Sequence, residues 1–424
     1  MTITLPQRKI PMYGDYDVIV AGGGFGGVGA ALAAARNGAK TCLLEKSATL
    51  GGLGTAGFVV IYLPICDGYG HQVSYGIVEE LLRLPMKYSP VKPNGAWNNK
   101  EQATEEELKA RRYELVYHPA TMSLGMERIL LEAGVTIFYD TLITDIVKDA
   151  SGAITHVVVE NKSGCGVFAT KFVIDGTGDA DICKFADEEC EVSKNNKPGA
   201  WYYSINTDNE IELRTRLYNP EKCPEEIKTM RLDGTDFHQV SEHIIRSHEL
   251  FLLDNEFHNE KPLSETGKIK FFPGFVPSMA CFLMTRRIVA PYTMTEADMH
   301  MWHDDAVGIF ADWRKAGPVY ALPYRSLYAQ RTPNLITVGR CISTTGDTWD
   351  VARVIPVCSI SGEAAGTAAA LCLRDNVQRF ADLNVGVLQA QLVKAGVKLD
   401  RSLVENVYDD ASNIRHKTTK TNFI

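Results

Sequence analysis

A glycine-rich turn between an apolar strand and an alanine-rich helix is the feature that most constrains the fold of this chain. Asp15 to Ala21 ends in the run Val-Ile-Val-Ala, and glycines at 22, 24 and 27 follow it directly. The alanine-rich segment Ala30 to Asn37 predicts a helix, and Lys40 to Glu45 predicts a second buried strand. Residues 16–45 therefore predict one β-α-β unit with parallel strands.

The three glycines of this turn have separate physical roles. Gly22 permits the tight turn, Gly24 lets the backbone approach a pyrophosphate, and Gly27 allows the helix to pack closely on the sheet. The start of the helix offers unpaired N–H groups to an anion. Glu45, at the end of the second strand, is placed to accept hydrogen bonds from ribose hydroxyls, and an acid there disfavours a 2′-phosphate. The sequence predicts a dinucleotide site, with a purely structural turn as the alternative.

The stretch from Gly22 to Gly57 resembles the opening of flavoproteins with the glutathione-reductase-type FAD-binding fold, because a second glycine-rich stretch follows the ribose acid. Val173 to Ala180 resembles the strand and turn by which that family returns to its cofactor, and Leu335 to Asp347 resembles its late FAD motif. The resemblance implies that FAD is the cofactor, with Asp347 near the ribityl chain. It further implies cofactor contacts at Lys46, Gly51, Gly52, Thr55, Gly178, Asp179 and Gly339.

Segments that begin at Cys66, Leu322 and Arg353 are similar to a bacterial group of FAD-dependent oxidoreductases. The similarity covers roughly residues 16–186 and 275–400. It implies a fold and a cofactor, and the substrates of this group are mostly undefined. We expect an enzyme that exchanges a hydride between flavin N5 and a small-molecule substrate. The chain departs from disulfide reductases in two ways, since no redox C-x-x-C-type pair and no second glycine fingerprint for a nicotinamide cofactor are present in the sequence.

The expected fold class is α/β, a Rossmann-like FAD-binding domain of the glutathione-reductase type with an inserted α+β substrate lobe. We expect the first part of the FAD-binding domain at residues 1–189, including a small antiparallel meander at 140–172. The substrate lobe is expected at 190–325, and the return segment with C-terminal helices at 326–424. The active site is expected between the domain and the lobe.

Three predicted helices bear on function. Charged helices are expected in the lobe at Asp236 to His258 and Thr295 to Lys315, beside mixed strands near 268–272 and 279–289. A small-residue helix is expected at Ser361 to Leu373. Its N-terminus, which includes Gly362, is expected to face the flavin pyrimidine edge, where the helix dipole would stabilise the reduced flavin. Tight packing of small residues against a sheet is a compatible alternative.

Hydride transfer requires a substrate carbon over the flavin and a group that moves a proton, often with a cation for an anionic substrate. The catalytic candidates are Arg353, between the late FAD motif and the small-residue helix, His71 in a glycine-flanked loop, and Arg325. A surface or ion-paired arginine and an exposed loop histidine are the alternatives. Further candidates are Arg286, His118, Tyr75 and Tyr324.

Two other groups of reactive side chains are set aside. His300 and His303 stand beside two aspartates on the expected helix, but a solvated polar face explains that pattern better than a metal, so no metal site is expected. Cys66 is expected to be a buried free thiol in preference to a covalent flavin attachment point.

Composition limits the partners. The net charge of −8 without a long block of like charge argues against nucleic acid. The ten scattered cysteines predict reduced thiols and a cytoplasmic protein. Six glycines interrupt the apolar run Val18 to Ala35, so we expect no membrane span there and no membrane partner. No oligomeric state is predicted.

Two other functions fit the sequence. A reductase of activated double bonds, fed by a separate electron carrier, would polarise its substrate with paired cations such as Arg286, Arg287 and Arg325. A flavin-holding subunit of a larger redox complex would show a large apolar patch on the lobe and no enclosed cavity over the flavin. A plain NAD-binding dehydrogenase is disfavoured by the two later FAD-like segments.

Overall fold

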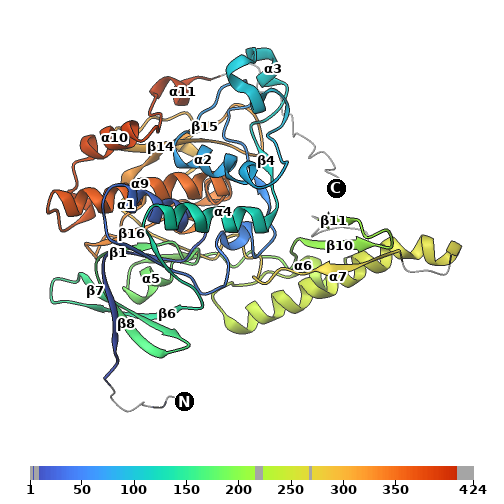
Figure 1. Ribbon diagram of the computed structural model, residues 1–424, viewed down its shortest axis with the longest axis horizontal. Helices are drawn as coiled ribbons and strands as arrows, with labels where there is room; N and C mark the ends of the chain where they lie inside the picture. The colour runs from blue at the N-terminus through green and yellow to red at the C-terminus, as the bar shows by residue number, and fades with distance from the viewer. Residues whose placement is uncertain (1–2, 4–8, 215–222, 267–269, 408–424) are drawn as a thin grey trace.

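A mixed sheet of seven strands lies at the centre of the computed structural model, which describes residue 3 and residues 9–214, 223–266 and 270–407 (Figure 1). Five of its strands run parallel in the order β5, β2, β1, β8 and β16. The α/β class predicted from the sequence is therefore confirmed. The bounds of these strands are β1 Met12–Ala21, β2 Thr41–Leu44, β5 Thr136–Phe138, β8 Gly164–Asp175 and β16 Leu335–Thr337.

The predicted β-α-β unit is present. The apolar end of β1 pairs in parallel with β2, with Val18 opposite Thr41 and Ala21 opposite Leu44. Helix α1 (Phe25–Arg36) connects the two strands. Gly38 has a φ of +89°, a conformation that favours glycine, and it ends the connection into β2.

The predicted antiparallel meander is confirmed as well, and β8 joins it to the parallel part of the sheet. Strands β6 (Leu142–Lys148) and β7 (Ile154–Asn161) pair with each other, and β7 pairs with the first half of β8. The second half of β8 pairs with β1 and β16. One long strand therefore brings the chain from the meander back to the edge of the sheet where the glycine turn lies.

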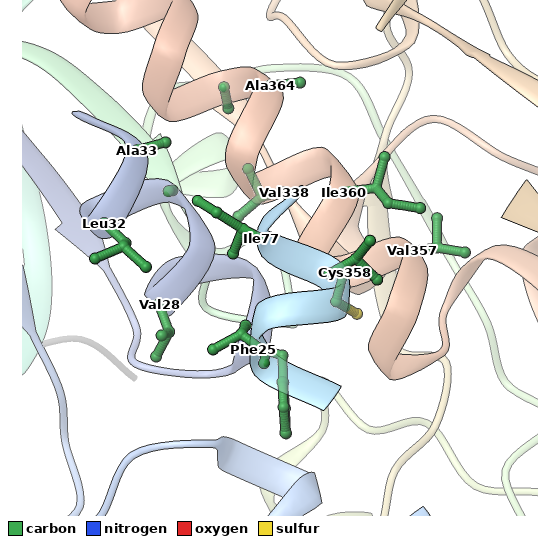
Figure 2. Packing of buried hydrophobic residues seen from close by; sticks show 14 of the residues in the cluster. Phe25, Val28, Leu32, Ala33, Ile77, Val338, Val357, Cys358, Ile360 and Ala364 are labelled. Carbon is green, nitrogen blue, oxygen red and sulfur yellow. The ribbon is translucent and has the colours of Figure 1, made fainter. Parts of the chain in front are cut away.

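Helix α9 (Ile355–Arg374) crosses α1 at very close range (Figure 2). A Cβ atom at Gly362 would overlap the carbonyl oxygen of Gly26, and one at Gly366 would overlap that of Ala30. The helix begins at Ile355, before the expected start at Ser361, and the role expected for Gly362 at the helix start is therefore wrong. Although α9 is apolar and long enough to cross a membrane, 94% of its most apolar window is buried in the protein.

A buried hairpin stands where a charged helix was expected at Thr295 to Lys315. Residues Ala306–Ala311 form β14, which pairs with β15 (Val319–Pro323). Every residue of both strands is buried, because the hairpin packs against α9, α10 (Val385–Lys394) and α11 (Arg401–Glu405). Burial on both faces outweighs the helical charge pattern that precedes the hairpin. The chain thus returns to the central core before the expected boundary at residue 325.

The lobe is a small antiparallel sheet with a long helix. Its strands are β10 (Tyr202–Asn206), β11 (Ile211–Arg214) and β12 (Phe271–Phe275). Helix α7 (Phe237–Thr266) packs against β12, and Figure 1 shows it running away from the central core. The prediction of a helix at 236–258 is confirmed.

The strand expected at 279–289 is present only as β13 (Arg286–Ile288), and residues 276–285 form an irregular segment before it. This segment, called the strap below, borders the site. The remaining elements are α2 Ile77–Arg83, α3 Glu105–Lys109, α4 Pro119–Glu132, α5 Asp181–Phe185, α6 Glu225–Thr229, α8 Gly346–Ala352, β3 Ile61–Tyr62, β4 Leu115–Val116 and β9 Cys190–Val192.

Candidate functional site

The carboxyl ends of four parallel strands meet at one edge of the sheet. Ligands of open α/β sheets bind at this edge, where the strand order reverses. A cavity of about 940 Å³ lies there and extends to the strap and to α7. The predicted cofactor contacts that line it are Gly22, Gly24, Glu45, Lys46, Gly51, Gly52, Gly178, Asp179 and Gly339.

The glycine turn after β1 has the shape required for a bound anion. Gly22 has a φ of +93°, and a Cβ atom there would stand 2.6 Å from the carbonyl oxygen of Gly176. A Cβ atom at Gly24 would meet nothing within 4 Å, so the face of this residue is open. One at Gly27 would overlap the carbonyl oxygen of Gly22, which explains the close packing of α1. Gly24 is the N-cap residue of α1, so the first N–H groups of the helix border the open space.

The second glycine-rich loop lies against the first. The N–H of Gly51 donates to the carbonyl oxygen of Gly23 at 2.8 Å, and Gly52 faces Gly24 across the gap. Thr55 does not line the cavity, so the contact expected there is corrected. Its hydroxyl donates to the carbonyl oxygen of Leu50 at 2.5 Å and holds the loop in shape.

Glu45 is fixed in place by the backbone around it. One carboxylate oxygen accepts the N–H of Gly23 at 2.7 Å, and the other accepts the N–H of Ser47 at 2.7 Å. A carboxylate has about four acceptor positions, so two remain for other donors such as ribose hydroxyls. The carboxylate therefore ties the end of β2 to the glycine turn and stays able to bind a ligand.

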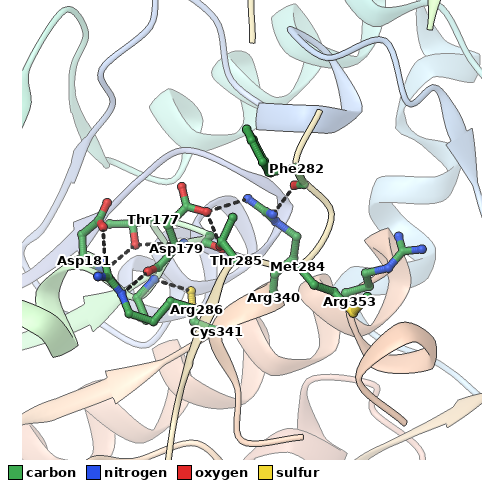
Figure 3. A network of polar contacts seen from close by, with 12 residues as sticks. Thr177, Asp179, Asp181, Phe282, Met284, Thr285, Arg286, Arg340, Cys341 and Arg353 are labelled. Carbon is green, nitrogen blue, oxygen red and sulfur yellow. Dashed lines mark hydrogen bonds and ion pairs between the residues drawn. The ribbon is translucent and has the colours of Figure 1, made fainter. Parts of the chain in front are cut away.

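A network of hydrogen bonds and ion pairs joins the turn after β8 to the strap (Figure 3). The hydroxyl of Thr285 donates to the Asp179 carboxylate at 2.5 Å, and the Arg286 Nε donates to the Asp179 carbonyl oxygen at 2.8 Å. Arg340, which follows Gly339 at the end of β16, donates to the carbonyl oxygen of Phe282 and lies 3.5 Å from the Asp179 carboxylate. Arg340 thus connects two strand ends to the strap.

Acidic and basic groups at the far end of this network affect one another. Arg286 also pairs with Asp181 at 2.5 Å. Burial, followed by the charges of Asp179 and Asp175, raises the pKa of Asp181, while Arg286 and Lys46 oppose that shift. Asp181 and Lys46 therefore lie in the part of the cavity that contains Glu45, at one end of the network.

Arg353 lines the other end of the cavity, beyond Arg340 in Figure 3. Its Nε and Nη2 atoms both donate to one carboxylate oxygen of Asp350, at 2.9 and 2.6 Å. Its Nη1 atom makes no hydrogen bond with the described part of the chain. Helix α9 begins directly after it, with Ile355 and Cys358 on the cavity wall. The start of α9 thus reaches the cavity, as expected, although at residue 355.

The rest of this end of the cavity is mainly apolar, with hydroxyl side chains at Thr235 and Ser278. The lobe contributes Val240 and Ile244 from α7, with Met279, Phe282 and Leu283 from the strap. The segment after the second glycine loop contributes Val59, Ile61 and Leu63. A ligand group in this part lies between largely hydrocarbon walls, with the guanidiniums of Arg340 and Arg353 at its edge.

Three predicted site residues lie elsewhere. His71 is on a surface loop where its Nδ1 atom lies 2.9 Å from the Asp67 carboxylate, and it does not line the cavity. Arg325 pairs with Asp305 below the hairpin β14–β15. Asp347 is an exposed residue of α8 that pairs with Arg314, so the contact expected with the ribityl chain is wrong. In each case the side chain pairs with an acidic or basic residue that lies outside the cavity.

Secondary candidates also have structural roles. Tyr324 is buried, and its hydroxyl donates to the carbonyl oxygen of Phe380. His118 is the N-cap residue of α4. Cys66 is buried away from the cavity, and burial raises the pKa of its thiol. His303 lies in a loop, since the helix expected around it is absent, and its Nε2 atom is 2.9 Å from the Asp298 carboxylate.

Several residues of the site were missed by the sequence analysis. Arg340 could have been found, because it stands one residue after a predicted contact at a strand end. Thr285 and Phe282 could not, since they come from an irregular segment that was expected to be a strand. Val240 and Ile244 are ordinary apolar residues of a long helix, and nothing in their pattern distinguishes a cavity wall from a core.

The chain was compared with known families and structures. The model of the FAD dependent oxidoreductase family matches residues 17–260 and 284–392. No curated protein sequence matches the chain. A geranylgeranyl bacteriochlorophyll reductase-like protein from Thermoplasma acidophilum is 15% identical with a TM-score of 0.40, over 94% of each chain. A myxobacterial chondrochloren halogenase is 16% identical with a TM-score of 0.43, over 89% of this chain and 78% of the other.

Proposed function

The chain belongs to the FAD dependent oxidoreductase family, and from that premise we propose that it exchanges a hydride between flavin N5 and a small-molecule substrate held against the lobe. FAD is its cofactor. The observation that carries the proposal is that one cavity contains both the strand ends of a dinucleotide site and the apolar wall of the lobe. The space for a cofactor and the space for a substrate are therefore continuous.

The residues present fit FAD. The open face of Gly24 and the first N–H groups of α1 suit a pyrophosphate, and Glu45 suits the adenosine ribose. The second glycine loop and Gly339 line the same path. We assign the cofactor to these residues, with its adenosine part toward Lys46 and its flavin part toward Arg353 and the start of α9.

FAD supplies a centre that accepts or returns a hydride when it is bound. The chain contributes three things to that chemistry. The apolar walls of the strap, α7 and residues 59–63 exclude water from the reacting atoms. The N-terminus of α9 offers partial positive charge to negative charge that develops beside it. Arg353 orients the substrate through its free Nη1 atom.

The arginines that a reductase of activated double bonds would pair do not converge. Arg286 borders the nucleotide part of the cavity, Arg287 is buried against Glu191 and Trp349, and Arg325 lies below the hairpin. A reductase would therefore have to use another pair, and Arg340 and Arg353 at one end of the cavity are the cations available for it. A cavity that reaches from the glycine turn to the lobe favours substrate chemistry on this chain over a flavin-holding subunit. The ten unpaired cysteines support a reducing compartment such as the cytoplasm.

Anaerobic reduction of the purified holoenzyme tests the proposal. We expect the absorption band of oxidised flavin to bleach with one class among NADH, alcohols, amines and hydroxy acids. The variant Arg353→Met should keep its FAD and lose most of the bleaching rate. Arg374→Met is the matched control, since Arg374 is an exposed residue that pairs with Asp375. Full bleaching by that substrate at an unchanged rate in Arg353→Met would contradict the assignment of the substrate site.

A further inference from the structure

The flavin end of the cavity has an uneven distribution of charge. The acids that line the cavity are Glu45, Asp179 and Asp181. Glu45 and Asp181 belong to the nucleotide part, and Asp179 lies between that part and Arg340. At the end formed by α9 and the strap, the lining contains two cations, Arg340 and Arg353, and among the described lining residues Asp179 is the carboxylate that approaches them. The charge of Arg340 is thus partly balanced by Asp179, whereas Arg353 keeps one N–H edge that can bind a ligand group.

Arg340 and Arg353 differ in whether their guanidinium groups are available to a ligand. Arg340 is engaged on both sides, with the Phe282 carbonyl oxygen and the Asp179 carboxylate. Arg353 is engaged on one side only, since both of its hydrogen bonds go to the same oxygen of Asp350. The side chain of Arg353 is only 14% exposed, so its Nη1 atom is held in a largely dry place and has hydrogen atoms to donate into the cavity.

Asp350 is itself fixed, which gives Arg353 a defined position. The second oxygen of Asp350 lies 3.6 Å from Arg314, and the Trp313 indole donates to the Asp350 carbonyl oxygen at 3.2 Å. A guanidinium oriented by one carboxylate and open on its other edge is suited to a second carboxylate.

The positive charge at this end affects the pKa values of two thiols. Cys358 lines the cavity, and Cys281 is buried in the strap. Burial raises the pKa of both thiols, while the charges of Arg340 and Arg353 act to lower it in each case. Both guanidiniums therefore act on the same small region, between the start of α9 and the strap.

The side chains around this region indicate what kind of group the rest of the ligand must carry. Val240, Ile244, Met279 and Leu283 stand on the lobe side, and Val59, Ile61 and Leu63 stand on the opposite side. These side chains offer hydrocarbon contact and no hydrogen bond, so they favour an apolar body. Thr235 and Ser278 of the lobe add hydroxyl groups to the lining, but a second charged group on the ligand would meet no ionic partner on these described walls.

We propose that the substrate is an amphipathic monocarboxylate, with its carboxylate on the Arg353 Nη1 atom and its apolar body between the lobe and residues 59–63. This inference rests on the proposed function and gives the substrate class for the same site. It distinguishes carboxylic acids from the alcohols, amines and neutral ketones that a flavoenzyme of this family could otherwise take.

Ligand binding to the oxidised holoenzyme tests the inference without turnover. The probes are hexanoate and phenylacetate, each with its amide of the same size, hexanamide and phenylacetamide, and acetate as an acid without an apolar body. Binding is followed by calorimetry and by the perturbation of the flavin absorption band. We expect each larger acid to bind about tenfold or more tightly than its amide and than acetate.

Substitution of Arg353 tests whether this residue binds the carboxylate of the ligand. In Arg353→Met we expect the affinity for both larger acids to fall about tenfold or more, with little change for the amides and for FAD. Arg353→Lys should restore part of the loss, and Arg374→Met should change nothing. Equal affinity for acid and amide in the natural protein overturns the inference, and so does failure of both acids to bind. Unchanged acid affinity in Arg353→Met overturns it as well.

These outcomes are separate from the test of the proposed function. If the acids bind through Arg353 but no compound reduces the flavin, the substrate class stands and the hydride exchange fails. If a neutral alcohol or amine reduces the flavin while the acids do not bind, the hydride exchange stands and the substrate class fails.

Discussion

The glycine turn at the strand ends and the apolar wall of the lobe border the same cavity, yet they constrain a ligand in different ways. At the strand ends the backbone itself faces the ligand, and Gly22, Gly51 and Gly339 have positive φ angles that other residues rarely adopt. In the lobe, side chains form the wall, and apolar side chains of similar volume can replace one another. The cofactor half is therefore restricted at single positions, whereas the substrate half is restricted only in volume and polarity.

The family match follows this division only in part, because it also covers the lobe up to residue 260. It covers the strand ends and breaks between residues 260 and 284, at the end of α7, in β12 and in most of the strap. The part of the lobe that this gap covers includes Met279, Phe282 and Leu283 of the cavity wall. The match includes Val240 and Ile244 of α7, so only the strap side of the lobe wall lies outside it.

The largest expected effect comes from Gly27→Ala in the cofactor half. The added Cβ atom would overlap the carbonyl oxygen of Gly22, so α1 must move away from the turn. We expect the free energy of unfolding to fall by about 2–3 kcal/mol and the purified protein to lack FAD. Thermal unfolding and the flavin content after purification measure both effects.

Gly24→Ala is the matched comparison, because its Cβ atom meets open space and its φ is −66°. The stability of the protein without cofactor should remain within about 0.5 kcal/mol, while the affinity for FAD falls about tenfold or more. Normal FAD affinity in this variant would show that the pyrophosphate does not pass over Gly24.

The two halves should respond to pH in opposite directions. In α9, burial raises the pKa of Glu363 to about 8, although the N–H of Ile77 donates to its carboxylate. In α7, burial lowers the pKa of His243 to about 4. The folded core binds a proton on Glu363 that the unfolded chain has lost, so its stability falls as the pH rises from about 4.5 to 8. The folded lobe rejects a proton on His243 that the unfolded chain takes up, so its stability falls as the pH decreases from about 6.5 to 4.

Hydrogen exchange of peptides from α9 and α7, measured across this pH range, tests the two signs separately. We expect each pH-dependent loss of stability to be about 1–3 kcal/mol. Glu363→Gln should abolish the loss of stability in α9 at alkaline pH, and His243→Gln should abolish the loss in α7 at acidic pH. An alkaline loss that persists in Glu363→Gln would mean that another group controls the core.

The fold and the cofactor half could be predicted from the sequence because backbone geometry selects residue types that are visible there. Gly22, Gly24 and Gly27 with Glu45 place the turn, the helix start and the strand end, and all four lie as expected. The expected contact at Asp347 failed because the acid is seven residues after Arg340, beyond the strand end, and pairs with Arg314. Distance along the chain does not determine which charged neighbour a side chain meets.

The substrate half could be predicted only in outline. Arg353 lies on the cavity, but His71 and Arg325 do not, and each of these two is held by an aspartate from a nearby loop. The hairpin at 306–323 was expected to be partly helical because polar residues before it have helical spacing. Long-range packing against α9 decided that segment, and such packing leaves no signal in a short stretch of sequence.

A smaller effect is expected where the two halves are joined. Arg340→Met removes the contacts with the Phe282 carbonyl oxygen and the Asp179 carboxylate, so the strap loses one attachment to the strand ends. We expect FAD to dissociate about three- to tenfold faster, with a cost of about 1 kcal/mol in stability. Stopped-flow dilution of the holoenzyme measures the rate, and an unchanged rate would show that the strap does not retain the cofactor.

The smallest effect is expected from Ile244→Ala in the lobe wall. The substitution removes hydrocarbon contact from the substrate part of the cavity and leaves the strand ends untouched. The affinity for hexanoate should fall about three- to tenfold, and the affinity for FAD should remain the same within error. Phe237→Ser, at an exposed position on the same helix, is the control. A large loss of FAD in Ile244→Ala would contradict the division of the cavity into two halves.

The cofactor content of the natural protein and of Gly24→Ala tests the central claim most directly. The proteins are purified under identical conditions and precipitated with acid, and the supernatants are analysed for released flavin. We expect one FAD per chain from the natural protein and clearly less from Gly24→Ala, whose affinity for FAD is expected to be about tenfold or more lower while its fold stays intact. Absence of FAD from the natural protein, together with failure to take it up from solution, would contradict the account.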